Sequence, residues 1–64
     1  MANVRTPRGR GAFYRLQAEL ARRRSVTMTD VSARDITLKL AETLDALADI
    51  EERIAREATE NKDR

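Results

Sequence analysis

Arginine is the residue type with the clearest chemical potential in this chain. Eleven of the 64 residues are arginine and only two are lysine. A guanidinium group presents its donors in a planar fork that matches phosphate or carboxylate, so these side chains favour binding to acidic groups. The candidates lie within the first 24 residues: Arg5, Arg8, Arg10, Arg15, Arg22, Arg23 and Arg24. GC-rich coding would produce the same excess, so the pattern permits an anion-binding role without requiring one.

Side chains that support catalysis or metal binding are scarce. The sequence contains no histidine and no cysteine, which removes the commonest general base and the usual ligands of a zinc site. The acids of the second half alternate with arginines and lysines, so nothing indicates the burial that tunes a catalytic carboxylate. Tyr14 is better explained by packing than by stacking on a base. We therefore expect a protein that is not an enzyme and takes no cofactor, metal or small-molecule substrate.

A long amphipathic helix is predicted over residues 33–58. Apolar residues recur there at spacings of three, four and seven, which keeps them on one face of an α-helix. The opposite side carries acids placed four residues before bases, as in Asp49 and Arg53, and the stretch contains no glycine or proline. We predict that the bulky apolar residues of this helix form an association interface, which consists of Ile36, Leu40, Leu44, Leu47, Ile50 and Ile54.

A shorter, basic helix is predicted over residues 12–24. Residues 1–11 hold both glycines and the only proline, which predicts a flexible arginine-rich arm before it. Residues 25–32 are rich in hydroxyl side chains, which favours a capped connector. Either Thr27 with Asp30 or Ser32 with Asp35 has the spacing of a capping box. The long helix then starts between residues 28 and 33, and residues 59–64 form a polar tail.

These elements predict an all-α fold, an αα-hairpin in which residues 1–11 are the arm and residues 12–64 are a single domain. Phe13, Leu16 and Leu20 of the short helix would cover the first half of the long helix. The thirteen residues of the short helix span only about 20 Å, so the second half of the apolar stripe on the long helix would stay uncovered. So small a chain buries little surface, and we expect it to self-associate into a small bundle or to bind a partner. A two-stranded coiled coil is the alternative packing, although Thr43 and Glu57 would occupy its core positions.

Charge is divided between the two halves of the chain. Residues 1–24 hold seven arginines against Glu19, a net charge of +6, whereas residues 25–64 hold ten acids against six bases, a net charge of −4. The first half can meet a polyanion or an acidic protein surface, while the second half would repel either.

One stretch of the arm resembles a known DNA-binding element. Residues 7–10, Pro-Arg-Gly-Arg, resemble the core of the AT-hook, in which arginines follow the floor of the minor groove. Gly11 stands where that family has a second proline. The other interpretations are a general phosphate-binding arm and an arm that is solvated or docked on protein, and we favour the last.

Residues 20–32 resemble a helix-turn-helix motif. Ala21, Val26 and Val31 match the spacing of its alanine and its two apolar positions, and the resemblance implies a recognition helix after the turn. Arg24 and Arg34 stand where the motif has apolar residues, and a third helix is lacking. A capped connector is the preferred interpretation.

Two hypotheses of function follow from these features. In the first, the chain is a protein-binding inhibitor or adaptor, of the compact kind that phages and mobile elements use, docking through the long helix and the arginines. In the second, it is a nucleic-acid-binding accessory or regulatory protein, with the basic arm on phosphates and the long helix dimerising. We favour the first hypothesis because the acidic half would oppose a nucleic acid close by.

The same composition predicts a location. No apolar run approaches the length of a membrane span, and no apolar segment of a signal peptide follows the first arginines. The lack of cysteine is consistent with a reducing compartment. We expect a cytoplasmic protein that does not bind membranes.

Overall fold

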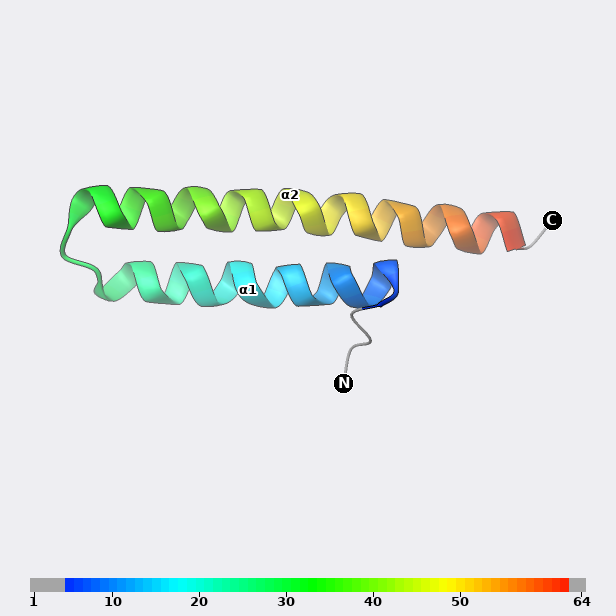
Figure 1. The fold of residues 1–64 in the computed structure, drawn as a ribbon, viewed down its shortest axis with the longest axis horizontal. Helices are drawn as coiled ribbons and strands as arrows, with labels where there is room; N and C mark the ends of the chain where they lie inside the picture. Colours follow the sequence, from blue (N-terminus) through cyan, green and yellow to red (C-terminus); the bar gives the residue numbers. More distant parts are fainter. Residues whose placement is uncertain (1–4, 63–64) are drawn as a thin grey trace.

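Two antiparallel helices form the whole fold (Figure 1). The computed structural model describes residues 5–62, with side chains through residue 60. Helix α1 spans Pro7–Thr27, helix α2 spans Val31–Lys62, and residues 28–30 connect them. α2 is the longer helix and extends beyond the start of α1 (Figure 1). The prediction of an all-α helical hairpin is confirmed.

Helix α1 begins five residues earlier than the periodicity predicted. Thr6 is its N-cap, and the Thr6 hydroxyl accepts a hydrogen bond from the Gly9 amide at 3.0 Å. Pro7 follows at the first helical position, where its missing N–H costs nothing and its fixed φ suits a helix. Residues 7–11, predicted to belong to a flexible arm, are therefore helical. Residues 1–4 of that arm lie outside the described part of the chain.

Asp30 starts α2. Its carboxylate accepts a hydrogen bond from the Ala33 amide at 3.1 Å, and its carbonyl accepts one from Arg34 at 2.9 Å. This is an N-cap by a single aspartate, rather than either of the two predicted capping boxes. The start at Val31 lies within the predicted range, whereas the end at Lys62 extends the helix past residue 58.

Small side chains line the interface between α1 and α2. We name this set of buried residues the alanine seam: Gly11, Ala18, Ala21 and Ser25 from α1, and Ala41 and Ala48 from α2. The positions in α1 are separated by seven, three and four residues, so they form one stripe along the helix. Ala18 and Ala48 have no exposed surface (0%). Leu44 is partly buried against this cluster.

The small side chains let the two backbones approach closely. A methyl group placed on Gly11 would lie 3.6 Å from the carbonyl oxygen of Ala48 and 3.4 Å from Cγ of Glu52. Contact at that range gathers many weak dispersion interactions. The one buried hydroxyl of the seam, on Ser25, donates to the Arg22 carbonyl at 2.6 Å, so its burial leaves no unpaired donor.

The predicted pairing of bulky apolar stripes is wrong. Phe13 and Leu16 do not cover the first half of α2, and Ile36 and Leu40 stay 69% and 53% exposed. The reason is that alanine and glycine stripes allow a closer helix contact than leucine stripes do. When the small residues turn inward, the bulky residues next to them on each helix remain outside.

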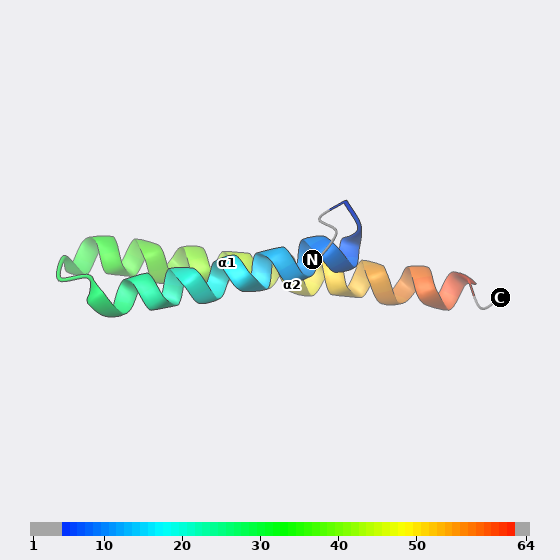
Figure 2. The same ribbon diagram turned by 90° about the horizontal axis from the view of Figure 1, so that it is seen from below.

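The shape of the molecule leaves these bulky residues without cover. The protein measures 52 × 21 × 13 Å, so it is one helix thick along its shortest dimension. The view from below shows a single layer, with the helices crossing at a small angle (Figure 2). A single layer of two helices buries only the stripe between them, because every other face meets solvent.

Candidate functional site

Bulky apolar side chains lie exposed beside the alanine seam. We name them the apolar face, which consists of Phe13 on α1 and of Ile36, Leu40, Leu47, Ile50 and Ile54 on α2. All six are exposed. Leu16 and Leu20 of α1 are bulky as well, but each lies two residues from the buried Ala18, which places them on the side of α1 that faces away from α2. Five of the six predicted interface residues of α2 belong to the apolar face. The sixth, Leu44, packs into the intramolecular interface instead.

Contacts between the helices place both parts of this face on the same side of the hairpin. Each helix has residues that flank the interface on its two edges. A contact between a flanking residue of α1 and a flanking residue of α2 identifies an edge that the two helices share. Arg10 of α1 contacts Glu51 of α2, which marks one edge. Phe13 lies three residues after Arg10, and Leu47 and Ile54 lie four before and three after Glu51. Residues at these spacings share a helix face, so Phe13, Leu47 and Ile54 lie along the edge that Arg10 and Glu51 mark.

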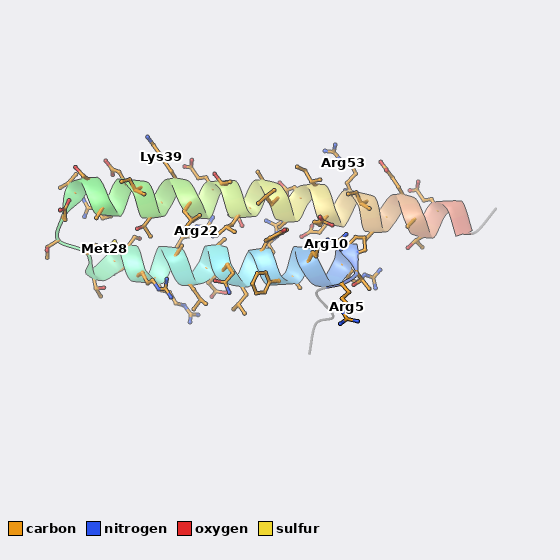
Figure 3. The ribbon with its side chains drawn as sticks, viewed as in Figure 1. Arg5, Arg10, Arg22, Met28, Lys39 and Arg53 are labelled. Carbon is orange, nitrogen blue, oxygen red and sulfur yellow. The ribbon has the colours of Figure 1, made fainter. Side chains whose placement is uncertain are left out.

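An arginine network occupies the other edge of the seam. Arg15 donates to three carboxylates of α2, at 3.0 Å to Glu52, 3.2 Å to Asp45 and 2.5 Å to Asp49. Arg22 donates to the second oxygen of Asp45. The prediction that Asp49 pairs with Arg53 along its own helix is therefore replaced by its pairing with Arg15 across the hairpin. Figure 3 shows Arg53 on the side of α2 that points away from α1, and Lys39 points away as well.

These contacts shift the acid–base behaviour of two groups. Hydrogen bonds from Arg22, and then from Arg15, hold the pKa of Asp45 below its usual range, against a smaller opposing effect of desolvation. The carboxylates of Glu52, Asp49 and Asp45 raise the pKa of Arg15 further above neutrality. Asp45 is therefore ionised and Arg15 charged in the folded hairpin at neutral pH.

Acid should weaken the contact between Asp45 and the two arginines. Because folding lowers the pKa of Asp45, its contribution to stability is present above the ordinary aspartate pKa of about 3.9 and is lost as pH falls through the lower folded value. We expect carboxyl NMR to show an Asp45 midpoint below that ordinary value. Arg22→Gln should raise the midpoint, and Arg15→Gln should raise it by less. An unchanged midpoint in Arg22→Gln would show that the contact is absent in solution.

The seven arginines predicted to bind an acidic partner do not form one free patch. Arg10, Arg15, Arg22 and Arg23 contact carboxylates of this same chain, Arg23 through Glu19 at 2.8 Å. Arg8 lines a shallow hollow of about 250 Å³ together with Glu52, Ala55 and Arg56. The side chain of Arg24 is exposed in the last turn of α1, where a cation suits the negative end of the helix dipole. The guanidinium of Arg10 also donates to the carbonyl of Arg5.

Part of this arrangement was readable from the sequence. Thr6 followed by Pro7 is the residue order typical of an N-cap and first helical position, and it marks the true start of α1. The spacing of Gly11, Ala18, Ala21 and Ser25 is also a regular stripe. Hydrophobic periodicity does not reveal this stripe, because glycine, alanine and serine contribute little to a hydrophobic pattern.

In the part of the chain that the structure describes, no three histidine, cysteine or acidic side chains are grouped so as to hold a metal ion. Neither helix offers, between residues 5 and 62, a stretch both long and apolar enough to traverse a lipid bilayer. In comparisons with known protein families, curated proteins and solved structures, the chain has no match.

Proposed function

We propose that this chain is a non-enzymatic protein-binding module, an inhibitor or adaptor, that docks on a partner protein through its apolar face. The observation that supports the proposal is the inversion of the expected packing. Small residues form the intramolecular contact, while the six bulky residues of the apolar face remain exposed along one edge of it. Scattered exposed apolar residues are ordinary on a protein surface, but a continuous set on one face is typical of an interface.

The residues of the apolar face lie on two regular helices. The backbone of both helices is ordered before binding, so association does not carry the additional entropic cost of ordering a loop. Phe13 and the aliphatic residues around it supply the type of centre that dominates binding energy in interfaces. The exposed arginine Arg24 lies in α1 at the connector end and would meet an acidic rim on the partner.

The ion pairs of the arginines favour a protein partner over a nucleic acid. Four of the seven candidate arginines already contact carboxylates of the same chain. A phosphate that approached Arg15 would also approach Asp45, Asp49 and Glu52, and their negative charge would oppose it. Binding to duplex DNA through six or so phosphates would need most of these arginines, and its affinity would fall steeply with salt.

The proposal is tested by comparing two matched double variants. Leu47→Asp with Ile54→Asp places two charges in the apolar face. Val26→Asp with Leu38→Asp makes the same change elsewhere, because these residues lie four after Arg22 and seven before Asp45, on the edge that carries the arginine network. Affinity purification with each form, with and without nuclease, identifies proteins that the wild type and the control both recover.

Binding of a recovered protein is then measured with purified components. We expect Leu47→Asp with Ile54→Asp to weaken the affinity by more than about 100-fold, since two interface anchors of about 2 kcal/mol each are lost. The control pair should bind within about threefold of the wild type. Equal binding by both double variants would refute the apolar face as the docking surface. Recovery that depends on nucleic acid, together with a gel shift at low salt, would favour the nucleic-acid hypothesis instead.

A further inference from the structure

Helix α2 has a second packing face beside the alanine seam. Leu40 and Leu47 each come directly before a residue of the seam, Ala41 and Ala48. One residue corresponds to a rotation of about 100° around a helix, so the second face lies at about a right angle to the first. We name it the α2 ridge, and it consists of the exposed residues of the apolar face on that helix: Ile36, Leu40, Leu47, Ile50 and Ile54.

The spacing within the α2 ridge is that of a contact with another helix. Leu40, Leu47 and Ile54 recur every seven residues, and Ile36 and Ile50 lie four residues before the first and the last of them. Side chains at these intervals pack into the gaps of a neighbouring helix. The alanine seam repeats at the same interval, and α1 already covers it. A helix with two such faces packs against two neighbours in a bundle, so the ridge, which spans about 27 Å, fits one further helix.

Positive charges border the α2 ridge on both sides. Lys39 and Arg53 each come directly before a member of the ridge, and both point away from α1 (Figure 3). Arg24 borders the ridge on the α1 side, because it lies eleven residues, about three turns, after Phe13. The side chains of Lys39, Arg53 and Arg24 take part in none of the ion pairs formed within residues 5–60.

The acids of α2 do not neutralise this border. The arginine network on the other edge holds three of them, Asp45, Asp49 and Glu52. Asp35 and Glu57 lie four residues from Lys39 and Arg53, a spacing at which helix ion pairs form, but neither pair is formed within the described residues. The three cations therefore favour carboxylates that come from another molecule.

We propose that the α2 ridge binds an amphipathic helix of the partner protein, whose apolar stripe has heptad spacing and is flanked by aspartate or glutamate. The inference rests on the proposed function and specifies the partner for the same surface. The bound helix lies along α2, with one acidic flank over Lys39 and Arg53 and the other toward Arg24. Together with α1 it gives α2 a neighbour on each of its two packing faces.

A second copy of this chain would suit the border poorly. If two α2 helices ran in opposite directions, Lys39 and Arg53 of one copy would face the same residues of the other. If they ran in the same direction, these cations would approach the α1 edge of the other copy, which carries Arg24. Both arrangements bring like charges together, whereas an acidic helix meets opposite charges.

Two synthetic peptides of about three heptads test the chemistry of the occupant against the purified full chain. Both carry leucine and isoleucine at the apolar positions. The acidic peptide has glutamate at every flanking position, and the basic peptide has lysine there. We expect fluorescence anisotropy to show that the acidic peptide binds at least about tenfold more tightly than the basic one, and that added salt narrows the difference.

Charge reversal on the chain provides matched variants. Lys39→Glu with Arg53→Glu should weaken binding of the acidic peptide by about tenfold, through loss of two exposed pairs and gain of repulsion, and should strengthen binding of the basic peptide. Arg34→Glu with Arg56→Glu makes the same change in net charge at two exposed sites, each eleven residues from Asp45 on the edge of the arginine network. This control should bind the acidic peptide within about threefold of the wild type.

The outcomes separate this inference from the proposed function. Equal binding of the two peptides, or an affinity unchanged by Lys39→Glu with Arg53→Glu, would overturn an acidic partner. Failure of both peptides to bind would overturn a helical one. Sedimentation of the chain alone as a dimer that Leu47→Asp with Ile54→Asp dissociates would show a second copy on the ridge and overturn the proposal. None of these results contradicts docking of a recovered protein through the apolar face, which the variants at Leu47 and Ile54 test separately.

Discussion

Replacing Ala18 and Ala48 together by leucine should unfold the hairpin. Both alanines are completely buried between the helices, and the carbonyl of Ala48 lies close to Gly11 of α1. Overpacking a well-filled interface costs about 1–3 kcal/mol for each residue. Two such costs, about 2–6 kcal/mol together, reach the whole stability expected of a domain this small. The helices would have to separate along their full length, because leucine occupies the space that the opposite backbone now fills.

Thermal unfolding followed by circular dichroism at one fixed protein concentration measures this effect. Ala46→Leu is the matched control, since Ala46 is exposed on the same helix only two residues from Ala48. We expect the control to keep the wild-type transition and the double variant to lose its cooperative transition. If the double variant melted like the control, the seam would not be the contact that holds the two helices together.

The ion pair between Arg10 and Glu51 should respond unequally to the loss of its two members. The side chain of Glu51 is only 16% exposed, beside Leu47 and Ile54, while that of Arg10 is 38% exposed. Arg10→Met leaves the carboxylate with little water and without its cation, and should cost about 1–2 kcal/mol. Removing one member of a fully buried ion pair costs several kcal/mol of stability. We expect a smaller cost here because solvent partly screens Arg10.

Glu51→Met should be neutral or stabilising, because the arginine that it leaves can reach water and the methionine adds apolar contact. Replacement of a desolvated pair by apolar residues is often favourable. The double variant Arg10→Met with Glu51→Met should therefore recover most of the loss caused by Arg10→Met alone. Urea unfolding at equal protein concentration gives the free energy of unfolding of the wild type, the two single variants and the double variant, which is a double-mutant cycle. Equal destabilisation by both single variants would contradict this account.

The arrangement of the helices explains how so short a chain can leave many bulky apolar side chains exposed. Alanine and glycine bring α1 and α2 together without using their bulky residues. The alanine seam then fixes the position of one helix relative to the other. The arginine network along the other edge adds ion pairs that salt would weaken. Most of the strongly apolar side chains remain exposed, and these are the ones that the proposed function uses.

Sequence reasoning identified the helices well and their ends less well. The regular spacing from Ile36 to Ile54 and the absence of glycine and proline were enough to predict α2. The hydroxyl-rich stretch 25–32 indicated a connector, but only residues 28–30 form one, because α1 continues to Thr27 and α2 begins at Val31. The start of α1 was placed at residue 12 because glycine and proline were interpreted as signs of a flexible arm, although a proline directly after Thr6 also suits the first turn of a helix.

The sequence by itself determined two amphipathic helices of opposite charge and the turn between them, because helix propensity, capping and periodicity act within a few residues of each other. Only the tertiary structure decided which stripes pair. Periodicity reveals which side chains gain by leaving water, but that gain is similar whether the cover comes from the same chain or from another molecule. Close contact between backbones, which the small residues at Ala18 and Ala48 permit, decided the pairing and left the apolar face outside.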